Sequence, residues 1–164
     1  KASSVVIIEA DFSPSAVALF LALLETGCVL VPLTSFVADK LDKFIKIAQG
    51  EWFIGLYGKD QATVKRLDGR ADYEMYRTLR ERGHPGLVLF SSGSTGASKA
   101  ALHDLVGILE KFKTPRHSMR AISFLLYDHI GGVNTMLYTL SNTGCLVTVQ
   151  DRSPTLSINS SKCT

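Results

Sequence analysis

Short apolar runs and stretches of helical period alternate along the chain. Runs of consecutive apolar residues are typical of buried strands, and they cover residues 4–10, 28–33, 52–56, 87–90, 120–126 and 145–149, with 62–67 as a further candidate. Apolar residues three and four positions apart are typical of helices, and they fall within residues 14–26, 39–49, 72–82, 102–112 and 133–140.

Residues at the ends of these stretches support the assignment. Ser13 and Pro14 are suited to the N-cap and the first position of a helix, and Gly27 to its C-terminal stop. The helix at 14–26 is apolar nearly all round, so we expect both of its faces to be covered. The stretch at 39–49 is instead amphipathic, with one apolar face and lysines on the other.

The alternation predicts an α/β layered fold, with a largely parallel sheet and helices on both of its faces. Ligands of such sheets bind at the carboxyl ends of the strands. We expect residues 1–150 to form the folded domain. Residues 151–164 are rich in serine, and we expect a loose or truncated tail there.

Composition and charge argue against several classes of function. The 164 residues suit one domain, and 46% are hydrophobic and 20% charged, as in ordinary globular proteins. The net charge of +3 forms no basic stripe, so nucleic acid is not an expected partner. The longest apolar run, Ala16–Leu24, is too short to span a bilayer. Three widely spaced cysteines predict neither a disulfide framework nor a zinc site, and they favour a reducing cytoplasm.

The chain begins at Lys1 without Met, and we expect it to be a piece of a longer protein.

The clearest candidate chemistry lies in residues 86–104. The run Leu87–Phe90 predicts a buried strand, small residues follow directly, and a helical pattern begins about two residues after Lys99. Glycine N–H groups, hydroxyls, a lysine and a helix N-terminus all suit a bound phosphate. The alternative is an ordinary strand-to-helix connection. We predict a phosphate-binding loop that consists of Ser91, Ser92, Gly93, Ser94, Thr95, Gly96 and Lys99.

The spacing of this loop is not that of a Walker P-loop, which requires Gly-Lys-Ser/Thr in succession. It resembles the phosphate loop of the adenylate-forming superfamily, which includes acyl-CoA synthetases, fatty-acyl-AMP ligases, luciferases and the adenylation domains of peptide synthetases. Ser98 stands where this family most often has Pro, and Ala100 where it has Gly. His103 matches the histidine that follows the family's loop.

The resemblance implies an activity for a longer parent protein. The parent would activate a carboxylic acid with ATP and Mg²⁺ to an acyl-adenylate, with release of pyrophosphate, and would usually pass the acyl group to a thiol such as coenzyme A. The loop would hold the β- and γ-phosphates with Mg²⁺. The family's later motifs, including its catalytic lysine, do not occur in this chain. We therefore expect part of the N-terminal domain, with no catalytic residue of its own and no activity alone.

A second group of candidate residues lies at 127–132, between a predicted strand and a predicted helix. It resembles the family's Phe-His-x-Gly-Gly segment, which lines the acyl or aryl pocket. The resemblance implies that His129, Gly131 and Gly132 contact the substrate. The alternative is that His129 caps the helix and the glycines only allow a tight turn. Asp128 is a candidate N-cap acceptor.

Two other functions remain open. The chain could be a non-catalytic nucleotide- or phosphate-binding module, or a degenerate scaffold. It could also be a phosphotransferase of another α/β class, with Asp151 after a strand as its metal ligand. The sequence has no Gly-x-Ser-x-Gly elbow, which argues against a serine hydrolase. No grouping of His, Cys, Asp and Glu has metal-ligand spacing.

Overall fold

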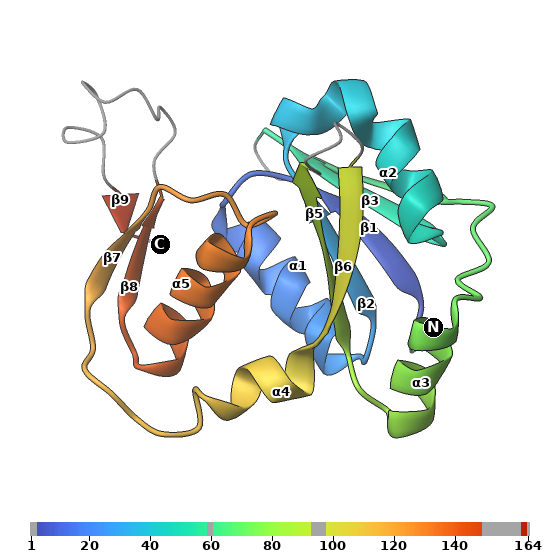
Figure 1. The fold of residues 1–164 in the computed structure, drawn as a ribbon. Helices are drawn as coiled ribbons and strands as arrows, with labels where there is room; N and C mark the ends of the chain where they lie inside the picture. The colour runs from blue at the N-terminus through green and yellow to red at the C-terminus, as the bar shows by residue number, and fades with distance from the viewer. Residues whose placement is uncertain (1–2, 59–60, 93–97, 149–161, 164) are drawn as a thin grey trace.

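The computed structural model describes residues 3–58, 61–92, 98–148 and 162–163. Its main feature is a six-stranded sheet in the order β4-β3-β1-β2-β5-β6 (Figure 1). The strands are β1 (Val5–Glu9), β2 (Val29–Leu33), β3 (Trp52–Tyr57), β4 (Gln61–Arg66), β5 (Gly86–Ser92) and β6 (Ser98–Asp104).

The centre of this sheet is parallel and both of its edges are antiparallel. Strand β1 pairs in parallel with β2 and β3, and β2 pairs in parallel with β5. The edge strands β4 and β6 each form an antiparallel pair with the strand that precedes them. The predicted α/β fold is therefore confirmed, with a mixed rather than a purely parallel sheet.

Helices cover both faces of the sheet, as predicted. One face packs against α1 (Pro14–Glu25), α4 (Leu105–Glu110) and α5 (Ile130–Ser141), and its core includes the fully buried Ile8, Phe20 and Leu87. The other face packs against α2 (Leu41–Ala48), which follows the 3₁₀ helix η1 (Ser35–Lys40), and α3 (Glu74–Arg82). Successive residues of β1 alternate between the two cores, which explains why the whole strand is apolar and buried up to Glu9.

A smaller sheet lies on the α5 side of the molecule (Figure 1). It consists of β7 (Arg120–Ser123), β8 (Cys145–Thr148) and β9 (Lys162–Cys163), in that order. Strand β8 is parallel to β7 and antiparallel to β9. Most of the predicted tail at 151–164 lies outside the described residues, and the domain boundary at residue 150 stays a prediction.

Two local expectations are wrong. The sequence predicts a helix that starts about two residues after Lys99, but Ser98–Asp104 forms β6 and the helix begins at Leu105. The helix at 14–26 forms with the predicted Ser13 cap, whose side chain accepts from the N–H of Ala16. Only one of its sides is buried, however, and Leu21 is 38% exposed.

The structure also describes the side chains of two of the three cysteines and tests whether any helix could span a membrane. The Cys28 side chain is buried, with its sulfur 3.5 Å from the hydroxyl of Thr26. Cys145 takes part in a disulfide bond, which the spacing of the cysteines does not predict. Within the described part of the chain, none of the helices has the length and apolar character needed to cross a bilayer.

Candidate nucleotide-binding site

The predicted phosphate loop joins the two strands of an antiparallel hairpin. Strands β5 and β6 pair continuously from Gly86–Asp104 to Ser92–Ser98, and Ser91 lies directly opposite Lys99. Directly opposed residues share a face of the sheet, so the Ser91 hydroxyl and the Lys99 side chain project from the same face. Both residues are exposed. The structure thus places the two ends of the predicted loop side by side.

The structure describes the two ends of this loop and not its inner part. Gly93, Ser94, Thr95 and Gly96 lie outside the described residues, and only the backbone of Ser92 is described. The expectation that a helix N-terminus supports the phosphate at Lys99 is wrong, because Lys99 lies in β6 and α4 begins six residues later. Any phosphate contact at this position must come from side chains and from backbone groups of the hairpin.

The turn that holds the second group of candidate residues is fastened to the main sheet. Asp128 Oδ2 accepts a hydrogen bond from the hydroxyl of Thr34 at 3.1 Å, although 94 residues separate the two in sequence. Thr34 is fully buried at the carboxyl end of β2. The adjacent Tyr127 is also buried, and its hydroxyl donates to the carbonyl of Ile8 at 3.4 Å. These contacts bring the residues before α5 to the carboxyl ends of β1 and β2.

His129 and the two glycines occupy the start of α5. His129 is at the N-cap position, but its side chain makes no capping hydrogen bond and is exposed. Gly131 and Gly132 lie inside the first turn of the helix, so they do not form a separate loop. A Cβ atom on Gly132 would lie 2.0 Å from the carbonyl oxygen of Leu126. Gly132 is thus required for packing, whereas the imidazole of His129 remains accessible to a ligand.

A cavity of about 180 Å³ lies between the hairpin and this turn. Its apolar lining includes Phe44 and Phe90, whose rings stack with centroids 4.1 Å apart. Its polar lining comes from three separate parts of the chain, namely the 3₁₀ helix η1, the hairpin and the turn before α5, which contribute Lys40, Ser91, Ser98 and Asp128. The cavity therefore joins one residue of the predicted phosphate loop to the second candidate segment.

Further polar residues gather at the carboxyl end of β1. Glu9 is buried, and its Oε2 accepts a hydrogen bond from the hydroxyl of Tyr57. This hydrogen bond, together with burial, raises the pKa of Tyr57 to about 12. Burial also raises the pKa of Tyr127 far above its ordinary value, and the nearby charges of Asp11 and Asp128 add to the effect. Both tyrosines remain protonated at neutral pH and act as hydrogen-bond donors.

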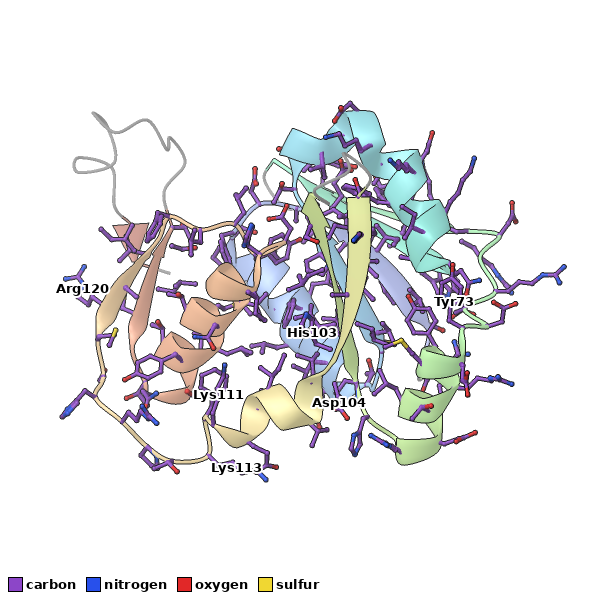
Figure 2. All side chains as sticks on the ribbon, in the orientation of Figure 1. Tyr73, His103, Asp104, Lys111, Lys113 and Arg120 are labelled. Carbon is purple, nitrogen blue, oxygen red and sulfur yellow. The ribbon has the colours of Figure 1, made fainter. Side chains whose placement is uncertain are left out.

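The opposite end of the hairpin is held by ionic contacts. Asp104 accepts a hydrogen bond from the N–H of Val106 at 3.0 Å and so caps α4, and its other oxygen lies 2.8 Å from His84 Nδ1. Burial alone would raise the pKa of Asp104, but the hydrogen bonds from His84 and Val106 outweigh it and lower the pKa. Figure 2 shows His103 and Asp104 at the end of β6 that adjoins α4. They belong to the base of the hairpin.

Three residues near the site were not singled out from the sequence. Thr34 fastens the turn, Lys40 lines the cavity, and Glu9 binds Tyr57. Thr34 and Glu9 are polar residues at the carboxyl ends of apolar runs, which is a signal for a site in a parallel sheet. Lys40 carries no such signal, because it belongs to the charged face of a predicted amphipathic helix.

Comparisons with known proteins find relatives by fold only. No family model and no curated protein sequence matches the chain. The N-terminal subdomain of Klebsiella oxytoca NpsA, in complex with 3-hydroxyanthranilyl-AMSN, matches with a TM-score of 0.66 and 20% identity. The match covers 93% of this chain and 43% of that chain.

Two other solved structures agree. Escherichia coli MenE with bound OSB-AMS has a TM-score of 0.60 and 17% identity, and the match covers 94% of this chain and 36% of that one. The A-PCP didomain of carboxylic acid reductase from Segniliparus rugosus, in complex with AMP, has a TM-score of 0.64 and 15% identity. That match covers 93% of this chain and 30% of the reductase. The chain has the fold of the NpsA N-terminal subdomain and of parts of the other two proteins, and it spans less than half of the length of each.

Proposed function

We propose that this chain forms the nucleotide-binding front part of an adenylate-forming enzyme. In a longer protein that contains it, ATP and a carboxylic acid would give an acyl-adenylate and pyrophosphate. One observation carries the proposal. The segment that resembles the family's phosphate loop has its two ends paired at the carboxyl edge of the sheet, where Ser91 and Ser98 line a cavity with Asp128. This is the edge at which α/β sheets bind ligands.

The proposed roles follow from the charge that develops in the reaction. The carboxylate attacks the α-phosphorus of ATP, the bond to the bridging oxygen breaks, and the electron pair leaves with pyrophosphate. Lys99 supplies a fixed positive charge, and the hydroxyls of Ser91, Ser92, Ser94 and Thr95 and the N–H groups of Gly93 and Gly96 supply donors for the departing phosphates. His129, at the start of α5, would face the carboxylic acid, with Gly131 and Gly132 beside it.

Mg²⁺ and a thiol acceptor are further parts of the proposal. The residues that the structure describes contain no group of three or more His, Cys, Asp and Glu side chains that could hold a metal ion. Mg²⁺ would therefore enter with the triphosphate, held mainly by phosphate oxygens. Coenzyme A is the acceptor that the resemblance favours. The use of ATP and coenzyme A suits a cytoplasmic enzyme, although a disulfide such as that of Cys145 is uncommon in the cytoplasm.

The test is binding of MgATP by the chain, measured by isothermal titration calorimetry. Lys99→Met should weaken binding about tenfold or more, because hydrogen bonds to charged groups contribute about 1.5–3 kcal/mol. Lys65→Met is the matched control, since Lys65 is exposed on β4 at the other edge of the sheet. Equal affinities of the two variants would contradict the proposed role of the loop.

The catalytic half of the proposal needs the longer protein. We expect ATP–pyrophosphate exchange that depends on a carboxylic acid from the longer protein, and none above background from this chain alone. Binding of MgATP by both, without exchange by either, would instead support the non-catalytic phosphate-binding module.

A further inference from the structure

We infer that Lys40 is a second cationic ligand for the phosphate chain, on the opposite face of the sheet from Lys99. The inference rests on the proposed function and adds to it a binding residue outside the loop that resembles the family's motif. Lys40 is the last residue of the 3₁₀ helix η1 and lines the cavity of about 180 Å³ beside Ser91 and Ser98.

The positions of the two lysines follow from the strand register. Lys99 is opposite Ser91, and the residues two and four positions before Ser91, Leu89 and Leu87, pack in the core on the α1 side. Lys99 therefore projects from the α1 face of the hairpin. Lys40 approaches from the other face, because it directly precedes α2, whose Phe44 packs in the core on the α2 side. Lys40 lines the cavity and Lys99 does not, so a phosphate chain that meets both ammonium groups would pass around the end of the hairpin.

The charge of the cavity supports a ligand contact for Lys40. Among the described residues that line it, Lys40 is the only cation and Asp128 the only anion. No carboxylate among the described residues forms an ion pair with the Lys40 ammonium group. A phosphate that enters as its Mg²⁺ complex would present negatively charged oxygens to Lys40 and the positive metal ion to Asp128. The ligand would then be complementary in charge to both residues.

The size and lining of the cavity suit phosphate better than a nucleoside. Its volume of about 180 Å³ is small for a ligand site. Such a space suits one or two phosphate groups, and the rest of a nucleotide would extend beyond it. Ser98 lies on the same face of the hairpin as Phe90, so its hydroxyl is a donor on the hairpin side of the cavity, and Lys40 supplies N–H donors on the other side.

Binding of inorganic pyrophosphate with Mg²⁺, followed by calorimetry, tests the inference on the 164-residue chain. Lys40→Met should weaken binding about tenfold. Lys43→Met is the matched control, because Lys43 is an exposed lysine of α2 that does not line the cavity, and it should stay within about twofold of the unchanged chain. Circular dichroism and urea unfolding would establish that both variants keep the fold.

Amine labelling gives a second readout that does not depend on a substitution. Acetylation of Lys40, measured by mass spectrometry, should be slowed by Mg²⁺ and pyrophosphate, while Lys43 should react at the same rate with and without them. The inference would be overturned if Lys99→Met lost binding, Lys40→Met bound as tightly as the unchanged chain, and the acetylation rate of Lys40 did not respond to the ligand. The proposed function would remain intact in that case. Absence of pyrophosphate and MgATP binding by the unchanged chain would overturn both.

Discussion

The β5–β6 hairpin and the turn before α5 reach the same cavity, but they are built in opposite ways. The ends of the hairpin loop carry exposed side chains, Ser91 and Lys99, and their places are set by backbone pairing alone. The turn is held by side chains, through the Asp128–Thr34 hydrogen bond, the buried Tyr127 and the close approach of Gly132 to Leu126. The hairpin can thus change its side chains at little cost in stability, whereas the turn cannot.

Gly132→Ala should have the largest effect on stability. The new methyl group would lie 2.0 Å from a backbone oxygen, so α5 must shift. We expect a loss of about 2–4 kcal/mol in the free energy of unfolding, measured with urea. Gly107→Ala is the control in α4, where a Cβ meets nothing within 4 Å and should stabilise the helix by about 0.5–1 kcal/mol. Equal behaviour of the two variants would mean that the turn is as permissive as an exposed helix.

Thr34→Val should have the next largest effect. Valine keeps the shape of threonine but removes the hydrogen bond to Asp128, and the site is fully buried. The free energy of unfolding should fall by about 1–2 kcal/mol. Thr63→Val in the edge strand β4 provides the comparison and should cost less than about 0.5 kcal/mol. Asp128→Ala combined with Thr34→Val should then cost less than the sum of the two single changes.

Asp104→Asn should have a smaller effect that depends on pH. The folded pKa of Asp104 is below its ordinary value of about 4. A lowered pKa contributes stability that is present above the unfolded pKa and is lost as pH falls through the folded pKa. Urea unfolding at intervals between pH 7 and pH 2.5 should therefore show the variant less stable than the unchanged chain at pH 7. This difference in the free energy of unfolding should shrink below about pH 4. A gap of constant size would exclude the carboxylate as its source, and Asp68→Asn in an exposed loop should show none.

Lys99→Met and Ser91→Ala should have the smallest effects on stability, below about 0.5 kcal/mol each, because both side chains are exposed. Thermal unfolding of the two variants beside the unchanged chain is a sufficient measurement. A loss of more than about 1 kcal/mol from either would show that the hairpin depends on these side chains, which would remove the contrast with the turn.

The conformation of residues 98–104 shows that local sequence signals do not always determine secondary structure. Alanines and a leucine favour a helix, and the sequence predicts one that starts about two residues after Lys99, yet Ser98–Asp104 is the edge strand β6. Pairing with the buried strand β5 outweighs local propensity, because strand formation depends on the neighbour that is available. The strands at 4–10, 28–33 and 87–90 were predicted correctly, because these apolar runs are short and rich in β-branched residues or leucine, as is typical of strands buried on both faces.

The candidate site was predictable only in part for the same reason. The Ser91–Lys99 spacing and the glycines before the last long helix are local patterns, and the sequence displays them directly. The Thr34–Asp128 hydrogen bond joins residues far apart in the chain. Lys40 was expected inside a helix at 39–49, but it is the last residue of the 3₁₀ helix η1, and α2 begins after it. Contacts of this kind depend on tertiary packing, which no local pattern encodes.

The continuous register of β5 and β6 also restricts how this segment can evolve. Side chains alternate between faces along a strand, so deletion of one residue between Ala100 and Asp104 would move either the end of the hairpin or its base to the wrong face. Homologous sequences should accept substitutions along this strand but very few alignment gaps. The distance in sequence between the lysine of the hairpin and the aspartate at its base is then a length marker by which distant homologues can be recognised.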